Sequence, residues 1–291
     1  MHSTYGRNMQ TSPECVVSSR AGRVLAGRSF GPATGDPVLF IAGAATGKSM
    51  HFGDDLLESA HVRLITMDRP GMGASNPHPH RTLASTVDDY HDFFEGVTGE
   101  STIPVVANSQ GSVFGLGAAV AGWASRLVLV SPADQVAHPT VRSMLPTESA
   151  ELAMLAEEKP DKAAQIFRSF TPESMEQMVL AGSGREDRAC YSGHVFLSLY
   201  RKALAEGFAN AGAGYVCDSL IAMRPWELSL ERIRIPVTVL FGDEDQTHSP
   251  DQGRTLTHRI PGAYRRAIPG IGGALLWKHP QTVLDLCRTL E

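Results

Sequence analysis

Short apolar runs rich in β-branched residues alternate along this chain with longer stretches of helical character. Strands are predicted for residues 37–41, 62–67, 104–107, 126–130, 236–241 and 264–268, and helices for residues 48–58, 82–97, 110–121 and 281–290. An antiparallel pair of strands is expected at 15–18 and 23–26. Continuous apolar strands that alternate with helices indicate a mostly parallel sheet with helices on both faces.

The alternation stops between about residues 137 and 230, where the chain is richer in Met, Glu and Ala. Helices are predicted there for residues 148–157, 172–180 and 194–206. Open α/β sheets hold their ligands beyond the carboxyl ends of the strands. We therefore expect an α/β core made of residues 14–136 and 231–291, with residues 137–230 forming a helical cap over the strand ends. Residues 1–13 are expected to be a flexible lead.

Composition favours an ordinary globular protein. The chain has 291 residues, of which 42% are hydrophobic and 20% charged, and its formal net charge is −5. These values favour neither a nucleic acid nor a membrane as a partner. The polar N-terminus lacks the apolar segment of a signal peptide, and no apolar run approaches the roughly 18 residues that span a bilayer. Four widely spaced cysteines form no CxxC pair, so we expect a cytoplasmic protein.

Ser109 is the first candidate for chemistry. It is the central residue of Ala107-Asn108-Ser109-Gln110-Gly111, which lies between an apolar strand and a helix of small residues. A nucleophile elbow holds its nucleophile in a strained backbone conformation on a strand-to-helix turn, so the residues two positions away must be small. Ala107 and Gly111 satisfy that demand, and the pattern predicts that Ser109 lies at such an elbow.

Three further motifs accompany the elbow: Ile41-Ala42-Gly43-Ala44, a glycine-rich turn over residues 67–75 that begins Met67-Asp68-Arg69, and Gly242-Asp243-Glu244-Asp245. With them, the chain resembles the α/β-hydrolase superfamily over nearly its whole length, and most closely its lidded bacterial esterases and aminopeptidase-like members. The resemblance implies a mostly parallel central sheet, helices on both faces and an inserted helical cap.

The same resemblance implies roles for particular residues. Asp245 would be the acid of a catalytic triad, with Asp134, which follows another strand, as a second candidate. The backbone N–H groups of Ala44 and Gln110 would form an oxyanion hole, where they would face the developing negative charge beside Ser109.

The expected catalytic histidine is missing from its usual place. The superfamily carries it in the loop after the last strand, where this chain reads Pro269-Gly270-Ile271-Gly272-Gly273-Ala274, so Gly273 stands at the histidine position. A serine hydroxyl is a poor nucleophile without a base. Loss of a triad member costs on the order of 10⁴ to 10⁶ in rate. His248, three residues after Asp245, and His279, at the start of the last helix, are the candidate replacements, and His194 is a remote one.

The functional hypotheses follow from this departure. The leading one is an enzyme that acts on a small ester, lactone or thioester, with Ser109 at the elbow and an altered triad. A lyase, cyclase or isomerase could use the same oxyanion hole without a nucleophile, and an inert ligand-binding relative is a third possibility. No cofactor or metal is expected, because metal-ligand spacings are absent from the sequence. Candidate substrate-binding residues in the cap are Phe196, Tyr200, Met223 and Trp226.

Overall fold

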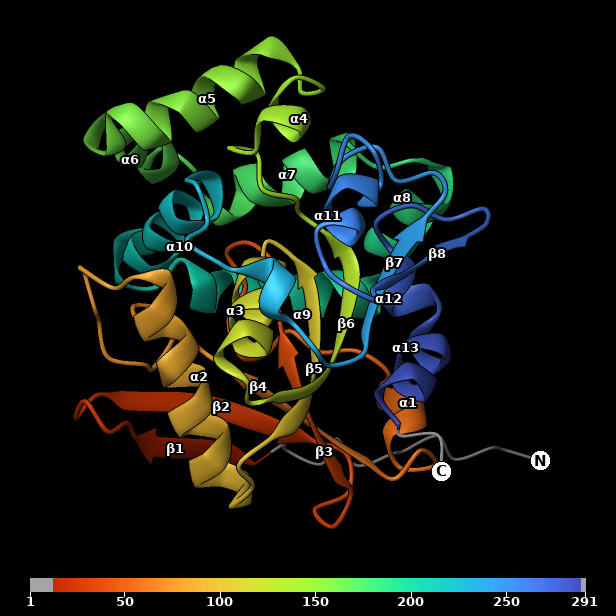
Figure 1. The fold of residues 1–291 in the computed structure, drawn as a ribbon. Helices are drawn as coiled ribbons and strands as arrows, with labels where there is room; N and C mark the ends of the chain where they lie inside the picture. The colour runs from red at the N-terminus through yellow and green to blue at the C-terminus, as the bar shows by residue number, and fades with distance from the viewer. Residues whose placement is uncertain (1–12, 289–291) are drawn as a thin grey trace.

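The computed structural model describes residues 13–288, which form a sandwich of helices around one twisted sheet (Figure 1). The sheet has eight strands in the order β1-β2-β4-β3-β5-β6-β7-β8. The strands are β1 (Glu14–Ser18), β2 (Val24–Phe30), β3 (Asp36–Ile41), β4 (Val62–Met67), β5 (Ile103–Ser109), β6 (Ala124–Pro132), β7 (Val237–Gly242) and β8 (Tyr264–Ile268).

The sheet is parallel except at one edge. Strand β1 pairs antiparallel with β2, and β2 pairs antiparallel with β4, whereas β4, β3, β5, β6, β7 and β8 run parallel to their neighbours. The mostly parallel sheet and the antiparallel starting pair are therefore confirmed. The expected flexible lead at residues 1–13 falls almost wholly outside the described residues.

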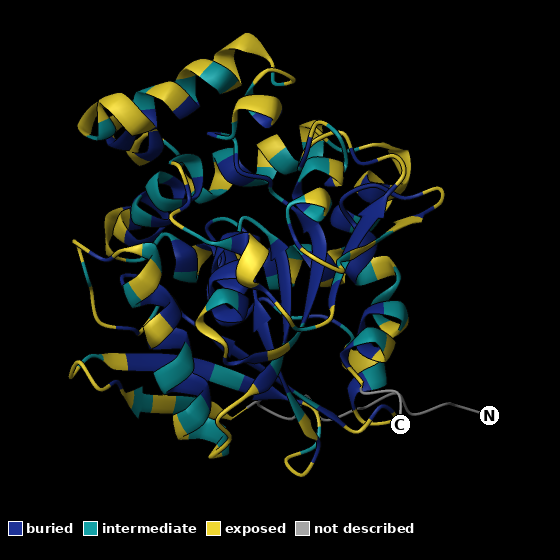
Figure 2. Cartoon of the chain, viewed as in Figure 1, coloured by how far each residue is buried: buried dark blue, intermediate teal, exposed yellow. Residues whose placement is uncertain are grey.

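Alternate residues of the central strands face two separate helix layers, because successive side chains of a strand point to opposite faces. Leu39 and Ile41 pack in the core under α2 and α3, whereas Val38 and Phe40 pack with α1, α12 and α13. The helices of these layers are α1 (Asp54–Leu57), α2 (Leu83–Thr98), α3 (Ser112–Ala121), α11 (Arg254–His258), α12 (Leu275–Lys278) and α13 (Pro280–Cys287). Figure 2 shows the central strands, β3 to β7, as the most buried part of the molecule.

Between β6 and β7 the described chain contains helices and no strand. They are α4 (Pro139–Arg142), α5 (Thr147–Glu158), α6 (Pro160–Arg168), α7 (Pro172–Ala181), α8 (Arg185–Tyr191), α9 (His194–Gly207), η1 (Asn210–Gly212), α10 (Ala213–Met223) and η2 (Leu230–Arg232). We call α4–α10 the helical insertion. Its outermost helices, α5 and α6, lie at the top of Figure 1, and much of their outer surface is exposed in Figure 2.

One predicted helix is largely wrong. Residues 48–58 were expected to be helical, but only Asp54–Leu57 are. The backbone N–H groups of Lys48 and Ser49 donate to the carboxylates of Asp68 and Glu206 instead. Gly53 then adopts a left-handed conformation, with φ of 77°, before the short helix begins. Tertiary hydrogen bonds thus override the local pattern, which carries only a weak preference. Within the described residues, no helix combines the length and apolar character needed to cross a membrane.

Candidate active site

Ser109 ends strand β5 on a tight turn into α3. Its φ is 51°, a left-handed conformation that a residue with a side chain rarely adopts. Gly111, two residues after Ser109, has no room for a side chain. A Cβ on it would lie 2.5 Å from the carbonyl oxygens of Ile41 and Ala42. The strand–turn–helix setting and the strained backbone are those of a nucleophile elbow.

A cavity of about 700 Å³ opens above Ser109, between the sheet and the helical insertion. Its walls come from the end of β5, from the loops after β3, β7 and β8, from α12, and from insertion helices α7, α8 and α9. Cavities of this volume are typical of small-molecule sites. Ser109, Asp245, His248 and Gly273 all line it.

His248 lies against Asp245 on the loop between β7 and α11. Its ring Nδ1 is 2.9 Å from one carboxylate oxygen of Asp245 and 3.1 Å from the other. The same carboxylate accepts the backbone N–H groups of Thr247 and His248, at 3.1 and 3.3 Å. This turn fixes the carboxylate and the ring together. With the Nδ1 proton donated to Asp245, Nε2 is the ring nitrogen available to accept a proton.

The pKa of Asp245 is lowered and the pKa of His248 is raised, so both shifts favour the charged forms. Burial disfavours the ionised Asp245 carboxylate, but the neighbouring imidazole and the hydrogen bonds of its turn outweigh burial and lower its pKa. Burial likewise opposes protonation of His248, but the carboxylates of Asp245 and Asp187 raise its pKa. The site thus contains an ionised acid oriented on a histidine.

Gly273 makes room for the imidazole. It lies in the loop between β8 and α12, and a Cβ built on it would be 2.7 Å from Cε1 of His248 and 3.2 Å from its Nδ1. Real Cβ atoms essentially never approach other atoms so closely. The ring of His248 therefore occupies space beside Gly273 that any side chain at that position would take.

The described structure has no hydrogen bond between Ser109 Oγ and the His248 ring, although both residues line the same cavity. Catalytic hydrogen bonds are often long or poorly aligned before a substrate binds. The other histidine candidates lie elsewhere: His279 is at the junction of α12 and α13, and His194 is at the start of α9, and neither lines the cavity.

The loop after β3, where the oxyanion hole is predicted, is held in place by hydrogen bonds from Arg69. Gly43 approaches Ser109 closely, since a Cβ on it would be 3.1 Å from Ser109 Cβ. The Arg69 guanidinium donates to the carbonyl oxygens of Ala42 and Gly43, at 3.0 and 2.9 Å. Within the described chain the backbone N–H groups of Ala44 and Gln110 donate no hydrogen bond. They are free to meet an oxyanion, although Gln110 itself is not among the cavity-lining residues.

Comparison with known proteins agrees with this architecture. A profile described as the alpha/beta hydrolase family matches residues 38–285. The chain belongs to the alpha/beta hydrolase family. No curated protein sequence matches it significantly.

Solved structures share the fold of this alpha/beta hydrolase at low sequence identity. A probable hydrolytic enzyme from Pseudomonas aeruginosa has a TM-score of 0.73 at 16% identity, covering 96% of this chain and 95% of that one. The enol-lactonase from Burkholderia xenovorans has a TM-score of 0.68 at 18% identity, covering 94% and 99%. A thermophilic esterase from Thermogutta terrifontis has a TM-score of 0.67 at 18% identity, covering 94% and 96%. At these identities the likeness establishes the fold.

The predicted substrate-binding residues of this alpha/beta hydrolase separate into two groups. Phe196 and Tyr200, on α9, line the cavity. Met223 and Trp226 do not: Met223 packs against a hydrophobic core, and the indole of Trp226 lies in the core under α3, where it donates to the carbonyl of Ala222 at 2.9 Å. The sequence pattern could not separate the two groups, because all four side chains are large and apolar or aromatic.

Several cavity residues escaped the sequence interpretation. Tyr191 on α8 and Trp277 on α12 extend the aromatic wall, with ring centroids 5.1 Å apart between Phe196 and Trp277 and 4.8 Å apart between Tyr191 and Phe196. Asp187, also on α8, lines the cavity and is only 6% exposed. No motif in the sequence distinguishes these residues, because they come from short helices that carry no superfamily pattern.

Asp134, the second candidate acid, lies outside the cavity and is not hydrogen-bonded to His248 in the described structure. It is 2% exposed and accepts the N–H of Gln135, and burial raises its pKa to about 6. The geometry therefore favours Asp245 over Asp134 as the partner of a histidine.

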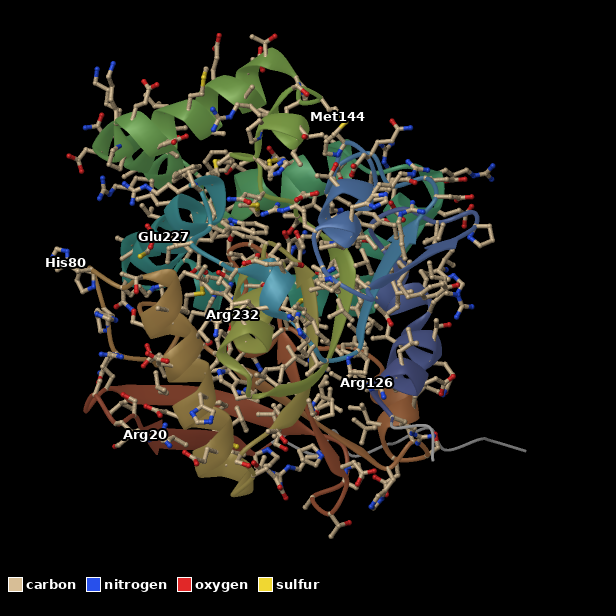
Figure 3. All side chains as sticks on the ribbon, viewed as in Figure 1. Arg20, His80, Arg126, Met144, Glu227 and Arg232 are labelled. Atoms are coloured by element: carbon tan, nitrogen blue, oxygen red, sulfur yellow. The ribbon has the colours of Figure 1, made fainter. Side chains whose placement is uncertain are left out.

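Among residues 13–288, one group of side chains is spaced as metal ligands are, namely His91, Asp92 and Glu95 on α2. Arg20 already forms ion pairs with Asp92 and Glu95, and Figure 3 shows Arg20 at the outer edge of the molecule. None of the three lines the cavity. This group is accounted for as a surface ion-pair network.

Proposed function

We propose that this protein is a serine hydrolase of small esters, lactones or thioesters, with a triad of Ser109, His248 and Asp245. The observation that carries the proposal is the place of His248: it is paired with Asp245, borders the same cavity as Ser109 and packs against Gly273. The triad base would thus be carried by the loop after β7, the same loop as the acid.

The mechanism follows from these positions. His248 Nε2 takes the proton of Ser109 Oγ as Oγ attacks the carbonyl carbon of the substrate, and Asp245 stabilises the imidazolium that forms. The N–H groups of Ala44 and Gln110 stabilise the oxyanion. His248 then returns the proton to the leaving alcohol or thiol, which leaves an acyl group on Ser109. Water deprotonated by His248 releases the acid and restores the serine.

The residues that line the cavity favour a substrate with a compact and largely apolar acyl group. Its apolar lining comes from methionine, valine and aromatic side chains, namely Met50, Met175, Met178, Val179, Tyr191, Phe196, Tyr200 and Trp277. Polar groups gather instead around Ser109 and the β7 loop. Such a division, apolar walls with a few convergent polar groups, orients a substrate carbonyl toward the nucleophile.

The direct test is a pair of alanine substitutions assayed on short-chain aryl esters. We expect Ser109→Ala and His248→Ala each to lower kcat by about 10⁴-fold or more, because triad members act as a unit. Rapid fluorophosphonate labelling at Ser109, located by mass spectrometry, should also be lost in His248→Ala. His279→Ala, which changes a histidine outside the cavity, is the matched control and should retain activity.

The opposite result would support another function. If Ser109 fails to label and Ser109→Ala keeps full activity on a carbonyl substrate, nucleophilic catalysis is excluded and the non-hydrolytic lyase, cyclase or isomerase becomes the better hypothesis. If binding of a ligand is found without turnover in the unmodified protein, the inert ligand-binding hypothesis is favoured.

A further inference from the structure

Asp187 connects the helical insertion to the loop that borders His248. It lies on α8, and its carboxylate accepts three consecutive backbone N–H groups: Gly272 at 3.0 Å, Gly273 at 2.8 Å and Ala274 at 3.1 Å. A carboxylate that is 6% exposed would be costly to bury without such partners. The three donors explain how it can be buried there.

The loop is shaped to receive this carboxylate. A Cβ on Gly272 would lie 2.2 Å from Oδ2 of Asp187, so a side chain at 272 would exclude the carboxylate from its position. Gly273, next in the chain, leaves the space that His248 fills. Gly272 thus leaves room for the carboxylate of Asp187, and Gly273 leaves room for the imidazole of His248.

Asp187 also acts on His248 through its charge. Its carboxylate is the second acidic group, after Asp245, that raises the pKa of the ring. The third group on this side is the Tyr191 hydroxyl, whose pKa is raised well above its ordinary value by burial, so it stays neutral. Lys278, on α12, acts on Cys190 rather than on the ring. The carboxylates that raise the pKa of His248 are thus Asp245, from the core, and Asp187, from the insertion.

We infer that Asp187 is a positioning residue for His248: it fixes the 272–274 loop against which the imidazole rests, and so makes the proposed base depend on the helical insertion. This inference rests on the proposed function. Asp187 itself touches no reacting atom; it acts through the loop backbone and through its charge. Nothing in the superfamily pattern of the sequence points to it.

The test is Asp187→Asn, which keeps the size of the side chain but removes its charge and one acceptor. We expect kcat to fall roughly tenfold or more with little change in KM, since hydrogen bonds to a charged group are the strong ones. Removing the charge also lowers the pKa of His248. The ring then stays unprotonated to lower pH, so the acidic limb of kcat/KM should move to lower pH. NMR titration of the histidine rings measures the same shift without turnover.

Glu206→Gln is the matched control. Glu206, on α9, also joins the insertion to a core loop by accepting from the backbone N–H and hydroxyl of Ser49, at 2.7 and 2.6 Å. It does not line the cavity. We expect its loss to affect stability without moving the acidic limb. Asp187→Glu, which keeps the charge but displaces it, should lower kcat and leave the acidic limb nearer that of the unmodified protein.

The outcomes separate the inference from the proposed function. If His248→Ala is inactive but Asp187→Asn matches Glu206→Gln in kcat, acidic limb and histidine titration, the positioning role is overturned and the triad stands. If His248→Ala keeps its activity, the triad and the positioning role are both overturned.

Discussion

At the scale of single residues, Gly273 and His248 form a complementary pair. Gly273 has no side chain, and the ring of His248, which another loop carries, lies directly beside it. We predict that His248 takes the role of the histidine that the superfamily resemblance implies at 273. A Cβ at 273 and Cε1 of His248 would be 2.7 Å apart, so the two cannot both have side chains in this arrangement. The absence of a side chain at 273 and the position of the His248 ring thus have one steric explanation.

A single methyl group tests this explanation. In Gly273→Ala the imidazole must move, and a misplacement of about 1 Å can cost roughly 10²-fold in rate. We expect kcat to fall by about that factor in steady-state assays, with the folded structure retained by circular dichroism. Gly193→Ala, whose added Cβ meets only backbone oxygens and lies outside the cavity, is the control. Unchanged kcat in Gly273→Ala would contradict the role assigned to His248.

At the scale of elements, a buried charge network connects the helical insertion to the loop after β3. Asp218, on α10, is fully buried and pairs with both Arg69 and Arg81. Arg69 in turn holds the carbonyl oxygens of Ala42 and Gly43. The interaction with Asp218 raises the pKa of Arg69 despite burial, so the guanidinium stays charged. Helix α10 therefore stabilises the backbone that carries the proposed oxyanion hole.

Removing Asp218 should be costly. Asp218→Ala leaves two buried guanidinium groups without their carboxylate, and loss of one partner of a buried pair typically costs about 3–5 kcal/mol. We expect the free energy of unfolding, measured by urea titration, to fall by that amount. Glu176→Ala, which breaks an ion pair with the mostly exposed Arg201, is the comparison and should change it by about 1 kcal/mol or less. Equal losses in the two variants would contradict this account.

At the scale of the whole molecule, the cavity is acidic. Four of the described residues that line it are acidic, Asp187, Asp243, Glu244 and Asp245, and none of those lining residues is Lys or Arg. The chain as a whole has a formal net charge of −5. Like-charge contacts on binding cost several kcal/mol. The site should therefore favour neutral or cationic substrates over anionic ones.

Three thioacetates test this preference, with leaving groups that end in a trimethylammonium, a tert-butyl or a carboxylate group. The first two have nearly the same shape and differ in charge. We expect the carboxylate to give a kcat/KM at least about tenfold below that of the neutral compound, because a penalty of 1.4 kcal/mol already has that effect. The difference should shrink in high salt. A carboxylate substrate that is preferred would show that the acidic wall does not select the substrate.

Most of the fold could be predicted because it depends on local patterns. Apolar runs such as 62–67 and 126–130 are buried strands in the structure, and the helix predicted for residues 82–97 is α2. The failures lie where tertiary contacts compete with the local pattern, as at residues 48–53. Helices α6, α8 and α10 were also missed.

The candidate site divides in the same way. Ser109, Asp245 and the loop of Ala44 could be proposed from motifs, because a strained turn or a close backbone approach restricts the residues allowed there. Their catalytic roles stay predictions. His248 and His279 could not be distinguished from the sequence, since each lies only a few residues from a position that the superfamily motif marks.

The sequence by itself thus determined the family, the sheet and the elbow at Ser109, through periodicity and steric rules that act over a few residues. It also singled out Gly273, where the superfamily resemblance implies a histidine. Only the tertiary structure decided which histidine fills the space beside that glycine, and that Asp187 holds the loop next to it. The reason is physical: these contacts join the β7 loop, the β8 loop and an insertion helix, and contacts between segments far apart in sequence leave no local pattern in any of them.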